Sequence, residues 1–472
     1  MRAGRFTDAL GFAEQAVAGT RVCLPAHAML ATILLNLGRP QDADLVVTQA
    51  LECETGVADA YDGLAHVSML LGRHERSNAL YRRVVELSPG TARAWYNLAS
   101  SDRSLGKLDE AEAACNRAIA LDSTQYPSYL LRSELRVQTP ASNHVEVLQS
   151  LLQRPGLEDR ARLFLGYALG KELDDLHRFD EAFHWFSEAA RSRRRHLSYD
   201  VAVDEGKLRR IAEAFPAERA GTPIRREESD RYIFVVGLPR SGTTLLERIL
   251  TGLPNVRSNG ETDNFSRSLI AASPTDSRDV FLRAAAADPG QVAANYERFA
   301  GTGAPNERIL EKLPMNYLYL GAIHRALPQS KMLLVRRSPI DSCFAMYRTL
   351  FGEAYPFSYD LEELARYYAA YETLIRHWLA SFGEKIAEVV YEDLVSDPLR
   401  IGARVARHCG LPWIDTAIEV HKNAAASLTA SAAQIRRPIY GSSSGRWRHY
   451  RKHLEPLIRT LRQLGISLPD DA

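Results

Sequence analysis

The first half of the chain repeats its pattern of apolar, small and polar residues at a fixed period. From Gly4 to Gly38, and on to Gly72 and Gly106, each step is 34 residues. Two further sets of positions keep the same step, namely Leu30, Leu64, Leu98 and Ala31, Ala65, Ala99. The phrases that follow the glycines, such as LGRPQDADL and LGKLDEAEAA, carry apolar residues at the spacing of one helix face. This pattern predicts pairs of short amphipathic helices, with a glycine in the turn inside each pair and alanines where helices pack closely.

A 34-residue unit with W-x-x-L-A ahead of an L-G turn resembles the tetratricopeptide (TPR) repeat. We therefore expect residues 1–195 to form a TPR array, an α-solenoid whose last helix follows a degenerate repeat at about 127–175. Because Gly4 already holds the turn position, we expect either that the array starts irregularly or that residues upstream are missing from this sequence. A solenoid presents a concave surface, so the array is a candidate docking site for a protein or peptide. A structural or homodimerising role is the alternative.

Residues 196–228 separate the repeats from the rest of the chain. Residues 205–215 have a helical pattern, and a polar stretch follows at 216–231. We interpret 196–228 as a helical linker and place the domain boundary near residue 228.

The stretch YIFVVGLPRSGTTLLERIL at 232–250 combines three local patterns. Residues 232–236 are a continuous apolar, β-branched run, which is typical of a buried strand. Residues 237–244 are a turn-rich loop with two glycines, and residues 245–250 have apolar positions at helical spacing. A strand, a glycine loop and a helix in this order aim backbone N–H groups and a helix N-terminus at a phosphate. A strand-to-helix turn without a ligand is the alternative.

The loop has the spacing of a Walker A motif with one departure. Gly237 and Gly242 are spaced as in G-x-x-x-x-G-K-[ST], and Thr244 takes the [ST] position. Thr243, however, stands in place of the lysine that reaches the β- and γ-phosphates of a nucleoside triphosphate. The loop therefore suits a nucleotide with no γ-phosphate to transfer, and Arg240 supplies positive charge from inside it. A P-loop kinase, which would require Mg²⁺, is the rival interpretation.

The phrase G-x-P-R-S-G-T-T-L-L resembles the 5′-phosphosulfate loop of sulfotransferases that use 3′-phosphoadenosine-5′-phosphosulfate (PAPS). Within that superfamily it is most similar to the tyrosylprotein-sulfotransferase branch and its TPR-fused bacterial relatives. The resemblance covers about 229–455 and rests on five segments in the family's order. It implies a P-loop-like, parallel-sheet sulfotransferase domain at 229–472, with PAPS as co-substrate and no metal. The loop residues that it places on the donor are Arg240, Ser241, Gly242, Thr243 and Thr244.

The same resemblance implies three catalytic residues. Glu261 lies 21 residues beyond Arg240, where the family has the general base that takes the proton of the acceptor hydroxyl. Lys312 matches the family's K-x-P segment and would neutralise charge on the bridging oxygen of the leaving phosphate. Ser431 opens the family's S-x-x-Q-x-x-x-P pattern and would hydrogen-bond the sulfate-bridging region. A surface carboxylate at Glu261 and an exposed strand-end lysine at Lys312 are the alternatives.

The resemblance also implies a site for the 3′-phosphate, which follows a second strand at 331–335. Alignment on the strand selects Arg336, with Arg348 as a further contact, whereas alignment on S-P-x-D selects Arg337. In the second register Ala345 replaces the family's phosphate-binding serine, which removes one hydroxyl contact. Beyond a third strand at 387–390, Tyr391 would contact the nucleotide, and Arg446 would reach the 3′-phosphate in place of a lysine.

Composition narrows the functional classes. The chain has 472 residues, enough for two or three domains, and a formal net charge of +1, which argues against a general nucleic-acid or membrane-surface binder. Its five cysteines are scattered and include no C-x-x-C pair, so neither a disulfide framework nor a zinc site is indicated. We find no run of 18 apolar residues and no signal-peptide core, and we expect a cytoplasmic protein.

We therefore expect an enzyme that transfers a sulfuryl group from PAPS to a hydroxyl, on a protein or peptide docked by the repeats. The alternatives are a P-loop kinase and a TPR adaptor whose sulfotransferase-like domain is inactive. Protein tyrosine, sugar hydroxyls and small metabolites all remain open as acceptors, because a donor site does not identify the acceptor.

Overall fold

The structure of the chain is a computed structural model. It describes residues 4–19, 24–52, 56–216, 230–382, 385–423, 425–427, 429, 432–441 and 443–469. The chain divides into two compact units. The first is Met1–Leu151 with Ala424–Leu428, and the second is Leu152–Asn423 with Thr429–Ala472. The end of the repeat array that we expected at residue 195 thus falls inside the second unit. The boundary expected near residue 228 lies outside the described residues.

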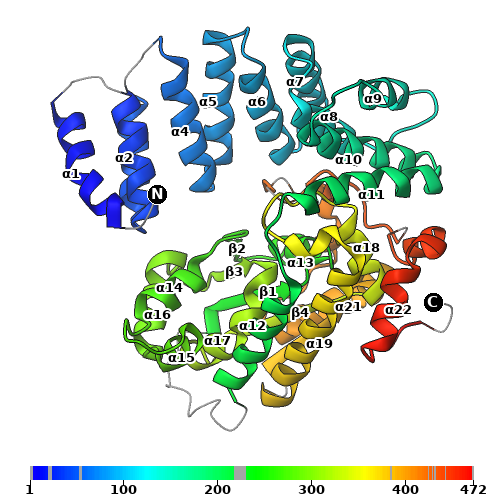
Figure 1. The fold of residues 1–472 in the computed structure, drawn as a ribbon. Helices are drawn as coiled ribbons and strands as arrows, with labels where there is room; N and C mark the ends of the chain where they lie inside the picture. Colours follow the sequence, from blue (N-terminus) through cyan, green and yellow to red (C-terminus); the bar gives the residue numbers. More distant parts are fainter. Residues whose placement is uncertain are drawn as a thin grey trace. The chain divides into compact units, whose positions relative to one another are not determined.

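The secondary structure of the first unit, in the residues described, consists of helices apart from one isolated bridge between Thr139 and Ser142, and the helices follow the predicted period. The helices α2, α4 and α6 begin 34 residues apart, and so do α3, α5 and α7. Figure 1 shows α2, α4, α5, α6 and α7 side by side in chain order. Their bounds are α1 (Gly4–Ala18), α2 (Leu24–Asn36), α3 (Pro40–Ala50), α4 (Ala58–Leu70), α5 (His74–Leu87), α6 (Ala92–Ser104), α7 (Leu108–Leu121), α8 (Tyr126–Glu134) and α9 (Val145–Leu152). The predicted helix-pair repeat is confirmed.

The repeated glycines and alanines have the roles that the sequence predicted. Gly38, Gly72 and Gly106 turn between paired helices with φ of 74°, 71° and 78°, a left-handed conformation that a Cβ disfavours. The three repeated alanines, Ala31, Ala65 and Ala99, are fully buried between helices. Gly4 differs from the other glycines, because it is the first residue of α1.

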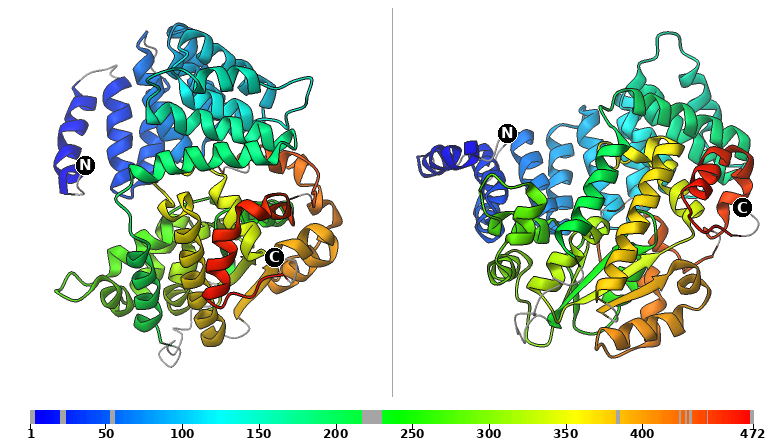
Figure 2. Two further views of the ribbon diagram at one scale, coloured as in Figure 1. Left: turned by 45° about the vertical axis from the view of Figure 1, so that its right-hand side comes forward. Right: turned by 60° about the horizontal axis from the view of Figure 1, so that its bottom comes forward.

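Three helices of the second unit precede its sheet. The helices α10 (Asp159–Asp175) and α11 (Phe179–Arg195) form a hairpin, and His177 occupies its turn with φ of 59°. The helix α12 (Val201–Ala214) forms within the expected linker and packs against α19 (Leu361–Phe382). The C-terminal helix α22 (Glu455–Gln463) also packs against α19, as both views of Figure 2 show.

The sheet of the second unit has five parallel strands in the order β2-β3-β1-β4-β5. The strands are β1 (Tyr232–Gly237), β2 (Val256–Ser258), β3 (Arg308–Lys312), β4 (Lys331–Arg336) and β5 (Ile386–Val390). Every residue of the central strand β1 is buried, as expected for a parallel sheet that helices cover on both faces. The predicted α plus α/β fold class is confirmed.

Side chains of alternate strand residues pack against helices on opposite faces of the sheet. Ile233 and Val235 face a cluster that includes Leu246 of α13 (Thr243–Thr251) and Val405 of α21 (Pro398–His408). Phe234 faces the other way and contacts aromatic rings of the helices that cover that side. The remaining elements are α14 (Asn264–Ala272), α15 (Val280–Ala286), α16 (Pro289–Ala300), η3 (Pro314–Tyr319), α17 (Leu320–Ala326), α18 (Pro339–Tyr347), η4 (Pro356–Tyr359), α20 (Tyr391–Ser396), η6 (Asp415–Ile418), η7 (Val420–Lys422), η8 (Gln434–Arg436) and η9 (Arg446–His453).

The strand order decides which loops meet. Because β1 lies between β3 and β4, the carboxyl ends of these strands deliver Lys312, the glycine loop and Arg337 to one edge of the sheet. Ligands of open α/β sheets bind at this edge. In the parts of the chain that the structure describes, no helix is both long and apolar enough to cross a bilayer.

Candidate functional site

The glycine loop, residues 237–244, connects β1 to α13 with a backbone that only glycine fits at two positions. Gly242 has φ of 107°, and a Cβ there would lie 2.4 Å from the ring of Tyr391. A Cβ at Gly237 would lie 2.5 Å from the carbonyl oxygen of Val335. The loop therefore packs closely against both β4 and Tyr391. Tyr391 is the residue for which the resemblance implied a contact with the nucleotide.

Two features of the loop suit an anion. Ser241 is buried, and its Oγ has no hydrogen-bond partner among the described residues. Gly242 is the N-cap residue of α13 and cannot cap it with a side chain, so the N–H groups that begin this helix point at the loop. A buried hydroxyl beside a helix N-terminus is a fitting partner for the 5′-phosphosulfate group that the resemblance implies. Thr243 and Thr244, also buried, begin the same helix.

Arg336 and Arg337 are adjacent in sequence but have opposite surroundings. Arg336 forms ion pairs with Glu372 at 2.7 Å and Glu388 at 3.0 Å. Burial alone would lower the pKa of Arg336, but the hydrogen bond and charge of Glu372 outweigh burial and raise that pKa above its ordinary value. Arg336 is thus neutralised by carboxylates, contrary to its expected role as a phosphate ligand in the register aligned on the strand.

Arg337 faces the glycine loop instead. Its guanidinium donates to the carbonyl oxygen of Arg240 at 3.0 Å and lies 4.8 Å from the ring centre of Tyr391. Burial lowers the pKa of Arg337 below its ordinary value, and Asp341, 3.9 Å away, offsets only part of this effect. Its Nε also has no hydrogen-bond partner among the described residues. Its guanidinium also donates to the main-chain oxygen of Ser443. A buried cation whose neighbours only partly offset the effect of burial on its pKa is suited to an anionic ligand.

Arg240, Arg337 and Tyr391 line an open pocket whose empty space, counted out to solvent, is about 720 Å³. Its described lining contains four arginines and no carboxylate. Ala345 also lines the pocket, as the register that selects Arg337 requires. The arginines are Arg240, Arg337, Arg348 and Arg437. Such a pocket favours a ligand with more than one negative charge.

Glu261 and Lys312, two of the three predicted catalytic residues, meet in an ion pair. Lys312 ends β3 beside Val235 of β1, and its side chain is 1% exposed, so the exposed-lysine alternative is wrong. Glu247 of α13 lies on the other side of Lys312, with its Oε2 at 3.6 Å from Nζ. The Glu261 side chain is 38% exposed, and solvent can reach it. The structure therefore places a solvent-accessible carboxylate and a buried cation side by side.

Glu311 is a buried residue of this region that the sequence analysis did not select. Its carboxylate accepts hydrogen bonds from Tyr296 at 3.0 Å, Asn316 at 3.2 Å and Asn264 at 3.3 Å. Burial raises the pKa of Glu311 to about 7, although these hydrogen bonds oppose the shift. Glu311 thus ties β3 to the segment just after Glu261. An acidic residue within the apolar strand sequence ILEKL is the one signal that could have identified it.

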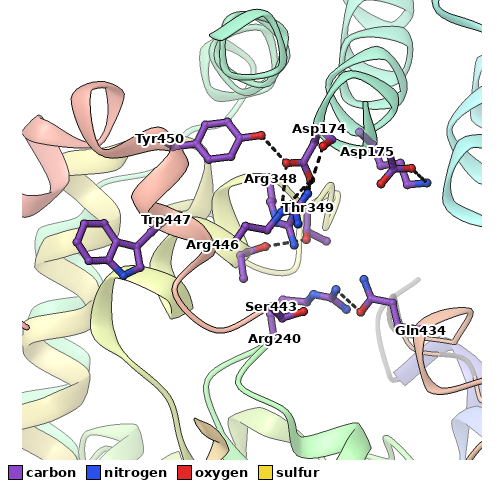
Figure 3. Close-up of polar contacts among 12 residues, drawn as sticks. Asp174, Asp175, Arg240, Arg348, Thr349, Gln434, Ser443, Arg446, Trp447 and Tyr450 are labelled. Atoms are coloured by element: carbon purple, nitrogen blue, oxygen red, sulfur yellow. Dashed lines mark hydrogen bonds and ion pairs between the residues drawn. The ribbon is translucent and has the colours of Figure 1, made fainter. Parts of the chain in front are cut away.

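Arg348 and Arg446, both assigned to the 3′-phosphate, are brought together by a residue that the sequence analysis missed. The carboxylate of Asp174 in α10 forms ion pairs with both arginines, each at 2.7 Å, and accepts the hydroxyl of Tyr450 (Figure 3). Of these two arginines, Arg348 is among the described residues that line the pocket, and Arg446 is not. No motif marks Asp174, which lies 272 residues before Arg446.

Arg240 and Ser431 are the remaining residues that the resemblance assigned to the site. Arg240 has φ of 65°, and its guanidinium donates to Gln434 Oε1 at 2.9 Å (Figure 3). Gln434 belongs to the pattern that Ser431 opens, but Ser431 itself lies outside the described residues. Among the described residues, no group of three or more His, Cys, Asp or Glu comes together to hold a metal ion.

Comparison with protein families agrees with this architecture. Residues 232–415 match the Sulfotransferase family, and residues 64–126 match the Tetratricopeptide repeat. The chain therefore carries a sulfotransferase family domain behind N-terminal TPR repeats, and the resemblance that the sequence analysis recognised is confirmed.

The chain also has distant curated relatives. A protein of Aquifex aeolicus (strain VF5), named only as uncharacterized, is 28% identical over 359 residues, which are 73% of this chain and 47% of that protein. Protein-tyrosine sulfotransferase 2 of Gallus gallus is 26% identical over 46% of this chain and 62% of its own length. The chain thus spans about half of the Aquifex protein.

Solved structures with some likeness to each part are also found. The sulfotransferase domain of the Synechococcus PCC 7002 olefin synthase has a TM-score of 0.38 at 16% identity and covers 50% of this chain and 95% of its own. The crystal structure of MamA has a TM-score of 0.27 at 17% identity and covers 42% of this chain and 93% of its own.

Proposed function

We propose that this protein transfers the sulfuryl group of PAPS to a hydroxyl acceptor. One observation carries this proposal, namely a pocket with four arginines and no described carboxylate beside a glycine loop that lacks the Walker lysine. A donor with phosphate groups at both the 5′ and 3′ positions would match such a lining. We propose that the glycine loop binds the 5′-phosphosulfate of this donor and that Arg337 and Arg348 bind its 3′-phosphate. Tyr391 is proposed to contact the nucleotide.

Glu261 is proposed as the general base. Bound PAPS would supply the sulfuryl group, which leaves the 5′-phosphate for the acceptor oxygen. Because that oxygen must lose its proton as it attacks, a proton acceptor is needed at the acceptor side of the donor, and a carboxylate can fill this role. Glu261 is accessible to solvent and beside Lys312, so its position supports this role.

Lys312 is proposed to stabilise the negative charge that develops on the leaving phosphate. Its buried ammonium lies between Glu247 and Glu261, and the pairing to Glu247 would keep it in place while Glu261 accepts a proton.

A protein or peptide is the proposed class of acceptor. Two observations support it. The chain has TPR repeats, which commonly bind peptides, and its curated relatives include Protein-tyrosine sulfotransferase 2 of Gallus gallus. A tyrosine side chain on such an acceptor would present the hydroxyl that Glu261 deprotonates.

Calorimetric titration tests the donor. Adenosine 3′,5′-bisphosphate, the product that PAPS leaves, should bind without added metal and raise the melting temperature by mass action. ATP with Mg²⁺ should stabilise much less, because Thr243 stands in place of the Walker lysine. Stabilisation by Mg-ATP that equals or exceeds that of the bisphosphate would favour the kinase and refute the proposal.

Mass spectrometry of peptide and protein acceptors, incubated with PAPS and the full chain, tests the transfer itself. We expect a sulfated product that depends on both the enzyme and PAPS. Binding of the bisphosphate with no product from any peptide, phenol or sugar would favour the inactive adaptor.

A further inference from the structure

Asp174 is a buried carboxylate at the edge of the proposed donor site, and it comes from a helix outside the region that matches the sulfotransferase family. That match covers residues 232–415, whereas α10 ends at Asp175. The Asp174 side chain is 3% exposed. Figure 3 shows Arg348, Arg446 and Tyr450 all directed at it.

The contacts of Asp174 differ between its two oxygens. Oδ2 pairs with Arg348 Nη1 and with Arg446 Nη2, and Oδ1 accepts the hydroxyl of Tyr450. Arg446 Nε donates to both oxygens at 3.2 Å. Arg446 Nη2 also donates to the main-chain oxygen of Asp174 at 3.3 Å. The carboxylate therefore holds two guanidinium groups at one place, where they would otherwise repel each other.

The charges at this place do not cancel. Burial alone would raise the pKa of Asp174, but the charges of Arg348 and Arg446 outweigh burial, and that pKa lies below its ordinary value. One carboxylate with two guanidinium groups leaves one positive charge. Arg348 lines the pocket, and Asp174 is not among the described lining residues. The excess positive charge therefore faces the pocket through Arg348.

We propose that Asp174 is a positioning residue that holds Arg348 at the pocket for the 3′-phosphate of the donor, with Arg446 bound behind it. This inference rests on the proposed function. Asp174 does not touch the ligand and acts through Arg348. The α10–α11 hairpin, which belongs to the array in sequence, thus forms part of the donor site.

The rest of the hairpin fixes the element that carries Arg446 and Tyr450. Phe179 of α11 stacks on His449 of η9 with ring centres 4.4 Å apart, and Phe183 stacks on His453 at 4.6 Å. These contacts hold η9 against α11, so Asp174 keeps its partners through packing as well as charge. A carboxylate inside a fixed network of this kind acts as a support for Arg348, and a phosphate in the pocket is not expected to displace it.

The test compares two nucleotides that differ by the 3′-phosphate alone. Calorimetry on the full chain would measure the dissociation constants of adenosine 3′,5′-bisphosphate and adenosine 5′-monophosphate, and their ratio gives the preference for the 3′-phosphate. We expect Asp174→Asn to reduce this preference at least ~10-fold, the effect of one misplaced charge-assisted contact. The affinity for the monophosphate should stay within about twofold of wild type.

Asp175→Asn is the matched control. Asp175 is the next residue of the same helix and pairs with Lys171 at 2.7 Å, so this change removes the same charge nearby. Its preference for the 3′-phosphate should equal that of wild type. Tyr450→Phe is a second variant for the case in which Asp174→Asn does not fold, because it removes only the hydroxyl donated to Asp174. It should lower the preference in the same direction by a smaller factor.

Each other outcome overturns the inference. Tighter binding of the bisphosphate by Asp174→Asn, beyond that of Asp175→Asn, would mean that the carboxylate competes with the phosphate. An equal loss for both nucleotides would mean that Asp174 only maintains the fold. An unchanged preference in both Asp174→Asn and Tyr450→Phe would also refute it. Failure of wild type to prefer the bisphosphate would instead refute the proposed donor site.

Discussion

Replacing the proposed base, Glu261→Gln, separates proton transfer from binding and from folding. Glutamine keeps the length of the side chain and can still accept a hydrogen bond from Lys312, but it cannot take the proton of the acceptor. A positioned general base contributes roughly 10²- to 10⁴-fold to rate, so we expect turnover to fall by that factor.

The surroundings of Lys312 indicate that this variant will fold. Lys312 keeps Glu247, whose carboxylate lies 3.6 Å from its ammonium. At an effective dielectric constant of about 20, the attraction over this distance is ~5 kcal/mol, so the buried cation stays paired. The Glu261 side chain is 38% exposed, and a pair that solvent screens in this way contributes at most ~1 kcal/mol to stability. We therefore expect a melting temperature within a few degrees of wild type.

The assay combines turnover of radiolabelled PAPS with calorimetric titration of adenosine 3′,5′-bisphosphate. Affinity for the bisphosphate should be unchanged, because Glu261 belongs to the acceptor side. Lys312→Met provides the contrast, since it should reduce turnover and also destabilise the fold by leaving Glu247 without its cation. If Glu261→Gln keeps more than about half of wild-type turnover, the base lies elsewhere and the reasoning fails.

Two further predictions address binding and pH. In calorimetry, Arg337→Met should weaken binding of the bisphosphate by at least ~10-fold, because Arg337 faces the glycine loop. Arg336→Met should not weaken it, because Arg336 is paired with Glu372 and Glu388. Equal effects of the two changes would contradict the assignment of Arg337 to the donor. Glu311 has its pKa raised by burial from 4.5 to about 7, so the folded state holds its proton where the unfolded state has lost it. Its contribution to stability is full below about pH 4.5, falls as the pH rises to about 7 and is constant above that. Urea unfolding at pH 5 and pH 8 measures this effect. Between these pH values the free energy of unfolding of wild type should fall by up to ~3 kcal/mol more than that of Glu311→Gln. If the unfolding free energies of wild type and variant instead change in parallel with pH, Glu311 is ionised in the folded state.

The sequence alone was sufficient for the elements whose causes are local. The 34-residue period predicted the helix pairs of the first unit, because residues close together in sequence determine both the apolar face of a helix and the glycine of its turn. The strand, loop and helix at 232–250 were predicted in the same way. The loop's departure at Thr243 directed attention to a donor without a γ-phosphate to transfer, and family resemblance supplied the pairing of Glu261 with Lys312 in one site.

Tertiary structure decided the features that depend on which distant segments meet. Sequence left Arg336 and Arg337 as alternatives, because alignment on the strand and alignment on S-P-x-D differ by one residue. Packing then placed Arg336 on Glu372 and Arg337 on the glycine loop. The insertion of β1 between β3 and β4 brought the functional loops to one edge of the sheet. Asp174 could not be found from any motif, because its role depends on a hairpin that packs against a segment 272 residues away. A local pattern records the conformation of its own segment, whereas the partner of a buried charge is determined only when the chain folds.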